Sequence, residues 1–254
     1  MLFQQTWQLK TIASIRSCYK EKFGIPRQAN LVSEAKAQLH FLPDYQQTGI
    51  VRALEDFSHL WLSFIFHETA EKGWHPTVRP PRLGGNQRVG VFASRSTFRP
   101  NPLGLSVVRL ERVETQGAAS ILHLSGCDLL DGTPIVDIKP YLAYADAISN
   151  AQSAYAQEKP AYRVVRFSEQ AQTECLLHEQ RLTAMGESVN LSLLIEQILQ
   201  QDPKPAYHKP PSKTVAKEAT ISPRRYAMRL FDLDIVWYDQ ATYLWVATLV
   251  LRQD

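Results

Sequence analysis

The segment from Lys72 to Arg109 contains seven lysines or arginines and no aspartate or glutamate. An arginine keeps its charge when buried, and its planar guanidinium can grip a carboxylate or a phosphate through two parallel hydrogen bonds. Four prolines between positions 80 and 102 stiffen this segment, so it loses less entropy on binding an anion. These features predict an anion-binding loop, although scattered surface arginines remain the alternative. The arginines concerned are Arg82, Arg88, Arg95 and Arg99.

Two other stretches carry side chains suited to acid–base chemistry. The apolar run HLWLSFIF ends in His67 and Glu68, which are placed to line a pocket, although a capping or surface role explains them equally well. Asp128 and Asp131 stand in the stretch DLLDGTP and offer two carboxylates, but an Asp-Gly turn alone explains this sequence. Pairing of these carboxylates for catalysis would require them to lie close together in the fold.

Several familiar kinds of site lack their motifs. Residues 85–90 match the first half of a phosphate-binding loop, but the Lys and the Ser or Thr that should follow are missing. There is no G-x-G-x-x-G after a strand and no H-E-x-x-H, so a Rossmann cofactor site and a zinc hydrolase centre are not supported. A metal-dependent hydrolase built on His67, Glu68 and His75 is a further alternative, and it predicts stoichiometric bound metal.

The composition is that of a globular chain. Its 254 residues are 44% hydrophobic, which is enough for a true core. The net charge is only +3, so a preference for a polyanion must come from local clustering. Three widely spaced cysteines argue against a disulfide framework and a zinc site. With no signal-peptide pattern and no apolar run of membrane length, we expect a cytoplasmic protein without metal or membrane segment.

Short strand patterns fill the first half of the chain. The run at 59–66 is almost wholly apolar and predicts a strand buried on both faces, with a buried helix as the weaker alternative. No long amphipathic helix separates the strands, which favours a barrel or sandwich over a doubly wound sheet. The expected strands cover residues 7–17, 38–42, 59–66, 88–92, 104–114, 119–127 and 133–138.

The character of the sequence changes after Ala145, where a small, polar, proline-terminated stretch indicates a linker. Asn190 is expected to cap a helix whose apolar stripe faces a core. We therefore expect one domain over residues 1–150 and a small α+β domain over 151–254. The other elements expected in the second domain are a helix over 168–182, a basic loop over 203–223, and a hairpin of strands over 225–239 and 242–252.

Five long stretches of the first domain are YKEKFGIPRQ at 19–28, FSHLWLSFIFHE at 57–68, GWHPTVRPPRLGG at 73–85, VGVFASRSTFRPNPLGLS at 89–106 and DLLDGTPIVDIKPYL at 128–142. Together they resemble the TsaA-like (YaeB) family of tRNA (adenine-37-N6)-methyltransferases. The stretch QDPKPAY at 201–207 extends the similarity into the C-terminal domain. One departure is Ala13, where relatives commonly have glycine.

The resemblance implies a mainly β chain, with a TsaA-like β-barrel methyltransferase domain that has no Rossmann sheet. A small α+β C-terminal domain would contact tRNA or substrate. The implied cofactor is S-adenosylmethionine, bound near the subunit interface of a homodimer. The implied reaction is N6-methylation of threonylcarbamoyladenosine at position 37 of threonine tRNA. A noncatalytic RNA-binding or regulatory module with the same fold is the alternative.

The resemblance also implies cofactor-binding positions. Arg95 is expected to hold the methionine carboxylate, and backbone groups near Leu105 and Leu130 are expected to read adenine, because fixed amide donors and acceptors recognise neutral edges. The full implied set is Pro26, Arg27, Gln28, His67, Glu68, Arg95, Leu105, Leu130, Asp131, Gly132 and Thr133.

Methyl transfer is an in-line displacement at a sulfonium, so the enzyme chiefly aligns the reactants and excludes water. The target nitrogen is a poor nucleophile. We therefore expect a carboxylate that accepts its proton, with Asp131 as the first candidate and Glu68 as the second. Basic residues in the loop 204–217 and the Arg224-Arg225 pair are expected to grip tRNA phosphates, unless they only keep the loop soluble.

Overall fold

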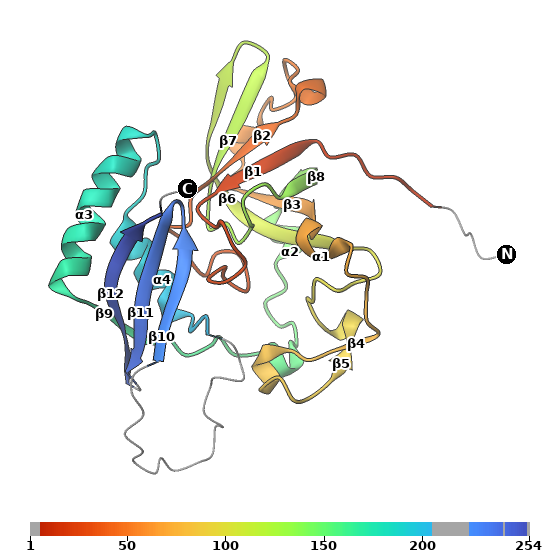
Figure 1. Cartoon of the computed structure of the whole chain (residues 1–254). Helices are drawn as coiled ribbons and strands as arrows, with labels where there is room; N and C mark the ends of the chain where they lie inside the picture. The colour runs from red at the N-terminus through yellow and green to blue at the C-terminus, as the bar shows by residue number, and fades with distance from the viewer. Residues whose placement is uncertain (1–5, 205–223, 241, 253–254) are drawn as a thin grey trace.

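Six antiparallel strands close into a barrel in the first half of the chain, in the order β1-β2-β7-β6-β3-β8 (Figure 1). The computed structural model describes residues 6–204, 224–240 and 242–252. The predicted mainly β architecture with a barrel is confirmed. The barrel strands are β1 (Ala13–Ser17), β2 (Ala37–Phe41), β3 (His59–Ile65), β6 (Leu103–Gln116), β7 (Ala119–Ser125) and β8 (Pro134–Pro140).

Alternate residues of each strand fill the barrel interior, as the two-residue period of a strand requires. In β3, Leu60, Leu62 and Phe64 are buried, while the residues between them are only partly buried. The prediction of a strand over 59–66 is confirmed. The prediction that both of its faces are buried is wrong, because a closed barrel has a single interior face.

Two other strands are shorter than expected. The strand expected over 7–17 begins only at Ala13, where pairing with β2 and β8 starts. The strand expected over 88–92 is reduced to β5 (Val89–Gly90), which pairs with β4 (Thr77–Val78). Neighbouring prolines, which cannot donate to a ladder, limit this small sheet. The remaining short elements are α1 (His67–Ala70), α2 (Ala143–Asp146) and 3₁₀ turns at Pro43–Tyr45, Leu54–Asp56, Pro81–Leu83, Val91–Ala93 and Ala154–Ala156.

The C-terminal unit is a four-stranded sheet in the order β10-β11-β12-β9, with α3 packed against it and α4 packed on α3 and β9. Strand β9, which the sequence did not predict, runs parallel to β12. The elements are β9 (Val164–Phe167), α3 (Glu169–Ala184), α4 (Leu191–Gln200), β10 (Arg224–Leu230), β11 (Leu233–Gln240) and β12 (Tyr243–Leu251).

A turn at Phe231 and Asp232 divides the single strand that was expected over 225–239, so that prediction is wrong. Phe231 has a left-handed φ of 54°. Asp232 accepts two hydrogen bonds from the Arg181 guanidinium of α3, at 2.7 and 2.6 Å, which fixes the turn. The usual glycine or proline signal for a break is absent here. The closing hairpin of β11 and β12 is confirmed.

Both predicted helices are confirmed, and each begins with a capping side chain. The Ser168 hydroxyl accepts from the Ala171 N–H at 2.9 Å, and Asn190 Oδ1 accepts from the Leu193 N–H at 3.0 Å. Such caps satisfy N–H groups that have no partner within the first turn. The buried stripe of α4 is Leu191, Leu194, Ile195, Ile198 and Leu199, as predicted.

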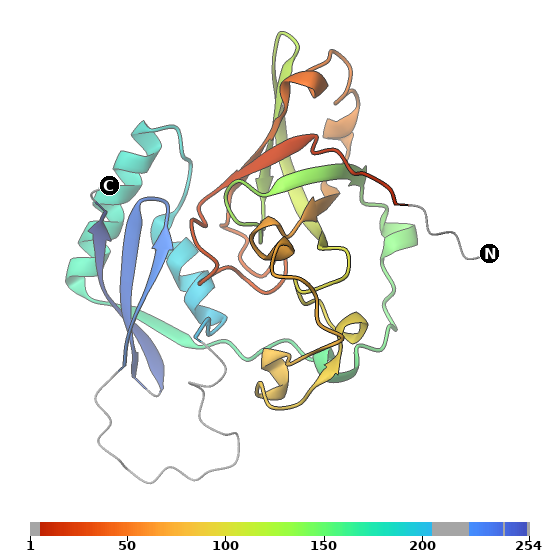
Figure 2. The same ribbon diagram turned by 45° about the vertical axis from the view of Figure 1, so that its right-hand side comes forward.

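The C-terminal core includes a loop from the N-terminal half of the chain. Cys18, Tyr19 and Ala35, which lie between β1 and β2, belong to the same buried cluster as Trp237 of β11. The Phe231 N–H donates to the Cys18 carbonyl at 2.8 Å. The β1–β2 loop therefore lies between the barrel and the C-terminal sheet (Figure 2).

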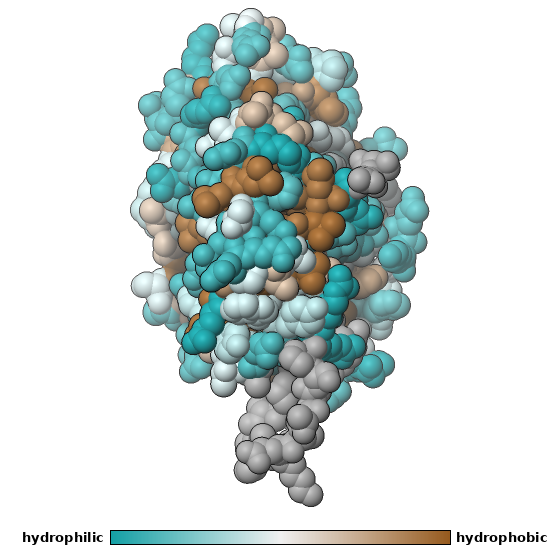
Figure 3. Space-filling model, turned by 60° about the vertical axis from the view of Figure 1, so that its left-hand side comes forward, coloured by the Kyte–Doolittle hydropathy of each residue, from teal (hydrophilic) through white to brown (hydrophobic). Residues whose placement is uncertain are grey.

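The linker after α2 follows the arginine-rich segment before it reaches β9. The Tyr155 hydroxyl donates to the Ala93 carbonyl at 3.0 Å, and the Arg82 guanidinium donates to the Glu158 carbonyl. The outer face of the C-terminal unit is hydrophilic with separate apolar patches (Figure 3), and Leu176 and Leu177 of α3 are exposed. None of the helices in the described ranges is long and apolar enough to cross a membrane.

Candidate active site

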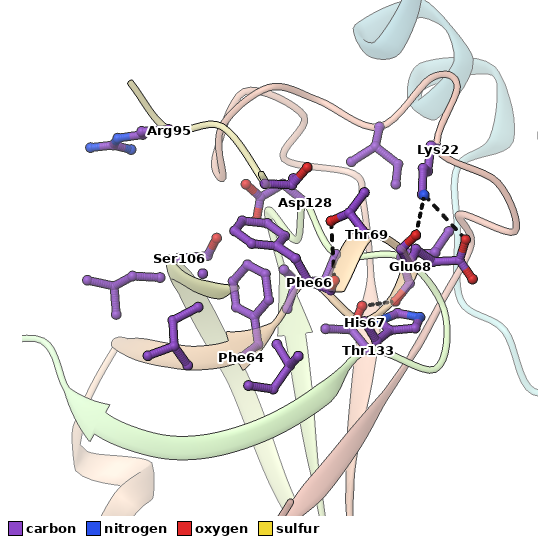
Figure 4. A pocket seen from close by; sticks show the side chains of 18 of the residues that line it. Lys22, Phe64, Phe66, His67, Glu68, Thr69, Arg95, Ser106, Asp128 and Thr133 are labelled. Atoms are coloured by element: carbon purple, nitrogen blue, oxygen red, sulfur yellow. Dashed lines mark hydrogen bonds and ion pairs between the residues drawn. The ribbon is translucent and has the colours of Figure 1, made fainter. Parts of the chain in front are cut away.

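A cavity of about 530 Å³ opens at the end of the barrel where β3 finishes and β6 and β8 begin (Figure 4). Sites for small molecules commonly measure about 300–1,000 Å³. The cavity brings together four of the five stretches on which the family resemblance rests. The predicted residues that line it are Pro26, Arg27, Gln28, His67, Glu68, Arg95, Leu105, Leu130 and Thr133.

Two aromatic rings give the cavity an apolar wall. The rings of Phe64 and Phe66 meet edge to face, with centroids 5.2 Å apart. Phe64 fits because residue 104 is glycine, since a Cβ at Gly104 would lie 2.2 Å from the Phe64 ring. Aromatic faces attract cations, so this wall suits a ligand that carries positive charge beside apolar groups.

Arg95 supplies a cation on another side of the cavity (Figure 4). Its guanidinium donates to Gln28 Oε1, which joins the arginine-rich loop to the β1–β2 loop. Arg99 donates to the carbonyl of Ser94 at 2.8 Å and so stabilises the loop that carries Arg95. Of the four arginines in the predicted anion-binding loop, Arg95 and Arg99 line the cavity, whereas Arg82 and Arg88 do not.

His67 and Glu68 lie at the start of α1, on the rim of the cavity. Lys22 Nζ pairs with Glu68 Oε2 at 3.3 Å and also donates to the Glu68 carbonyl at 3.2 Å (Figure 4). The Glu68 side chain is 53% exposed, so solvent screens this pair. The Glu68 carboxylate therefore sits at the solvent boundary beside a fixed cation.

The 128–133 turn forms a further wall, and two of its predicted residues do not line the cavity. Asp131 Oδ1 accepts from the Ser17 N–H at 2.9 Å, and Asp131 Oδ2 pairs with Lys20 at 2.7 Å. Gly132 donates its N–H to the Ile15 carbonyl and has a φ of 76°. These contacts tie the turn to β1 through Ser17 and Ile15, and to the β1–β2 loop through Lys20.

Asp128 could be named from the sequence only as one of two turn carboxylates, and like Phe64, Phe66 and Ser106 it is absent from the implied cofactor-binding set. It lines the cavity, and its Oδ1 is buried without a hydrogen-bond partner among the described residues (Figure 4). Burial raises the pKa of the Asp128 carboxyl to about 6, although the Ser106 hydroxyl and the Arg95 charge act in the opposite direction. Its place in the DLLDGTP stretch was the available signal, but burial could not be read from it.

The C-terminal unit holds the β1–β2 loop that enters the cavity. The Arg229 N–H donates to Glu21 Oε1 at 2.9 Å, and Tyr19 forms a bridge with Leu230. Burial lowers the pKa of Arg27 from its ordinary value, and the charge of Asp202 at the end of α4 opposes that shift. The second domain thus contributes to the electrostatic surroundings of this cavity.

The expected phosphate grip falls mostly on residues 205–223, which lie outside the described ranges. Lys204 is only 2% exposed and pairs with Asp239, so the expectation that Lys204 grips phosphate is wrong. A buried ammonium is tolerated where a carboxylate compensates its charge. Arg224 and Arg225 are exposed at the start of β10.

The arrangement gives no support to a metal-dependent hydrolase. Within the described ranges, no three histidines, cysteines or carboxylates gather as a metal-ion group. His75 instead lies against the Phe98 ring, with centroids 5.7 Å apart. The three cysteines are buried and free.

Comparisons with known proteins cover both halves of the chain. Residues 14–147 match the family described as the tRNA-methyltransferase O N-terminal domain, and residues 160–252 match the TrmO C-terminal domain. A tRNA (adenine(37)-N6)-methyltransferase of Escherichia coli K12 is 47% identical over 233 residues, which are 91% of this chain and 93% of the relative.

Two further matches come from Pseudomonas aeruginosa. A protein named putative S-adenosylmethionine-dependent methyltransferase RcsF is 47% identical, over 92% of this chain and 93% of its own length. A crystal structure of TrmO has a TM-score of 0.76 and 39% identity, and covers 97% of this chain and 99% of the other. The resemblance inferred from the sequence stretches is confirmed.

Proposed function

This chain belongs to the tRNA-methyltransferase O family, and we propose that it methylates N6 of threonylcarbamoyladenosine at position 37 of threonine tRNA. Its relatives are named as tRNA (adenine(37)-N6)-methyltransferases and as S-adenosylmethionine-dependent methyltransferases. The chain is accordingly a methyltransferase with S-adenosylmethionine as its cofactor. The threonylcarbamoyl group and the choice of threonine tRNA are the finer parts of the proposal.

The observation that supports the proposal most is the set of groups around the barrel-mouth cavity. S-Adenosylmethionine, which supplies the methyl group, carries a sulfonium, a carboxylate and an adenine. The rings of Phe64 and Phe66 offer faces to a cation, and Arg95 offers two donors to a carboxylate. Backbone groups near Leu105 and Leu130 are assigned to the adenine. The residues present therefore fit this cofactor.

Arg27 is a second cation in the cavity, and it is assigned to the carboxylate of the threonylcarbamoyl group. Burial lowers the pKa of this guanidinium, which remains charged at neutral pH because an arginine starts from a very high value. A guanidinium can grip a carboxylate through two parallel, charge-assisted hydrogen bonds. A carboxylate-bearing adenosine would thus be distinguished from plain adenosine.

Apolar side chains exposed beside the cavity support the proposal of a homodimer. Phe92 is 78% exposed and lies 6.0 Å from the Arg99 guanidinium, while Leu105 is 56% exposed. Large exposed apolar groups next to a site commonly mark an interaction surface. Sedimentation of Phe92→Asp would show a shift to monomer, whereas an unchanged dimer would exclude this surface.

A second region is proposed to bind tRNA phosphates. Arg224 and Arg225 are exposed at the start of β10, which is an edge strand of the C-terminal sheet. Neutralising each phosphate releases counterions, so affinity falls as salt rises. Changing both arginines to alanine should flatten the salt dependence of tRNA binding, and an unaltered slope would remove them from the interface.

The function is tested by supplying the purified chain with S-adenosylmethionine and two threonine tRNA substrates. One transcript carries threonylcarbamoyladenosine at position 37 and the other carries plain adenosine. Digestion and mass spectrometry should show one added methyl group on the threonylcarbamoyl nucleoside alone. Methylation of plain adenosine would contradict the substrate proposal, and tRNA binding without methyl transfer would favour the noncatalytic alternative.

A further inference from the structure

Asp128 differs from every other predicted or candidate carboxylate around the cavity. Glu68 pairs with Lys22, and Asp131 pairs with Lys20 and the Ser17 N–H. Among the described residues, none forms an ion pair with Asp128, and its buried Oδ1 has no hydrogen-bond partner. An unsatisfied buried carboxylate oxygen is costly and rare in folded proteins, so it calls for an explanation.

The groups that face Asp128 come from four parts of the chain. The Ser106 hydroxyl on β6, the Arg95 charge on the arginine-rich loop and the backbone N–H groups of Asp128 and Ala29 all favour its ionised form. Tyr19 and Cys127 are the other titratable groups near it, and burial keeps both in their neutral forms at neutral pH. The titratable neighbours Tyr19 and Cys127 are therefore uncharged, and Asp128 itself lines the cavity.

We propose that Asp128 is a catalytic residue that accepts the proton from N6 of the substrate adenosine during methyl transfer. This inference rests on the proposed function. N6 of a carbamoylated adenosine is ureido-like, so its lone pair is delocalised and its nucleophilicity is low. As the N6–CH₃ bond forms, the S–CH₃ bond breaks and its electron pair stays on sulfur. The N6 proton passes to the Asp128 carboxylate, which leaves a neutral, methylated ureido nitrogen and a protonated carboxyl group.

The position and basicity of Asp128 suit this step. Burial raises the pKa of the carboxyl to about 6, so Asp128 is ionised at neutral pH but is a stronger base than an exposed aspartate. General bases work best when their pKa lies near the working pH. Asp131 and Glu68 are each engaged in an ion pair, with Lys20 and Lys22, so their carboxylates already have partners.

The test compares Asp128→Asn with Asp137→Asn, a matched control on β8 whose side chain is 46% exposed and pairs with Lys139. Cofactor affinity is measured by calorimetry with S-adenosylmethionine, and turnover with threonylcarbamoylated tRNA. We expect Asp128→Asn to bind the cofactor within about threefold of wild type and to lose turnover by about 100- to 10,000-fold. The control should match wild type in both measurements.

A second variant gives a readout that a purely structural residue would not change. The Ser106 hydroxyl lowers the pKa of Asp128, so Ser106→Ala should move the acidic limb of the turnover–pH profile to higher pH. Wild-type turnover should rise through pH 6 as Asp128 ionises. An acidic limb that stays in place in Ser106→Ala would overturn the assignment.

The remaining outcomes separate the inference from the function on which it rests. Full turnover in Asp128→Asn, with loss in Asp131→Asn or Glu68→Gln, would give the proton-accepting role to one of those residues. Equal loss of cofactor binding and turnover in Asp128→Asn would make it a binding residue. If the wild-type chain fails to methylate the threonylcarbamoylated tRNA, the proposed function itself falls and the inference falls with it.

Discussion

Two partly buried aspartates, one in each half of the chain, have opposite surroundings. In the C-terminal sheet, Asp239 pairs with Lys204 and accepts a hydrogen bond from Arg163 at 2.9 Å. Desolvation raises its pKa, but these cations outweigh it and hold the pKa below the ordinary 3.8. In the barrel mouth, Asp128 has no ion pair with a described residue, and desolvation raises its pKa to about 6.

The difference separates a structural carboxylate from one available for chemistry. A compensated pair stabilises the fold around it, and removing one partner leaves a buried charge. An uncompensated carboxylate costs stability while it is ionised, and that cost is retained where a function needs the group. The same residue type therefore has opposite effects on stability in the two halves, which makes the contrast measurable.

The largest loss of folding stability is expected for Asp239→Asn. The substitution leaves the Lys204 ammonium, which is 2% exposed, without its main anion. Breaking a buried pair in this way costs about 3–5 kcal/mol. Urea unfolding at pH 7 should show a much lower midpoint. A midpoint close to wild type would mean that the Asp239 ion pair does not stabilise the fold, which would contradict the contrast with Asp128.

For Asp128→Asn we expect a change in stability of the opposite sign, namely a gain at pH 7. A folded-state pKa of about 6 against an ordinary 3.8 means that the folded chain binds more protons between these values. Stability from this group is greatest below pH 3.8 and is lost as pH rises through 6. Removing the charge should then stabilise the chain at pH 7 by up to about 3 kcal/mol.

Thermal unfolding at two pH values checks this prediction. The gain in Tm for Asp128→Asn should be clear at pH 7 and should shrink toward pH 4, where the wild-type carboxyl is already protonated. For Asp239 the lowered pKa reverses the sign, because its contribution is present above 3.8 and is lost as pH falls through the lowered value. A destabilised Asp128→Asn at pH 7 would show that its carboxylate is compensated.

Gly104→Ala tests the apolar wall of the cavity with a smaller effect. A Cβ at residue 104 would lie 2.2 Å from the Phe64 ring, so the ring must move. Overpacking of this kind costs about 1–3 kcal/mol. Calorimetry should also show weaker binding of S-adenosylmethionine. Gly90→Ala is the control, since a Cβ added there would meet no atom within 4 Å beyond its chain neighbours; equal losses in both would exclude a specific role for the wall.

The smallest effect is expected for Lys22→Ala at the cavity rim. The side chains of Lys22 and Glu68 are 48% and 53% exposed, so their pair resembles an ordinary surface ion pair. Such pairs contribute below about 1 kcal/mol. Urea unfolding should place this variant within that range of wild type. A loss of stability as large as that of Asp239→Asn would show that burial does not determine how much an ion pair of this chain stabilises the fold.

The sequence predicted the barrel and most of the cavity because long specific stretches carry the relevant residues. His67, Glu68 and Arg95 are recognisable from these stretches, and all three line the cavity. Asp128 could be named only as one of two turn carboxylates, since an exposed turn aspartate and a buried one look alike in sequence. Burial of an unpaired oxygen depends on contacts with distant residues such as Ser106.

The C-terminal half was harder to predict for related reasons. Lys204 stands in a basic, proline-rich stretch, so its composition indicated exposure, yet tertiary contact with Asp239 buries it. The break at Phe231 has no glycine or proline, and Arg181 of α3 fixes it from afar. Strand β9 is only Val164–Phe167, and its parallel pairing with β12 depends on tertiary structure.

The most direct test of the account is a crystal structure of the wild-type chain with S-adenosylhomocysteine and a threonylcarbamoylated anticodon stem-loop. We predict the sulfur against the Phe64 and Phe66 rings, and N6 of the adenosine within about 3.2 Å of the Asp128 carboxylate, which is the reach of a general base. A cofactor bound elsewhere, or N6 facing Glu68 with Asp128 remote from it, would contradict the account.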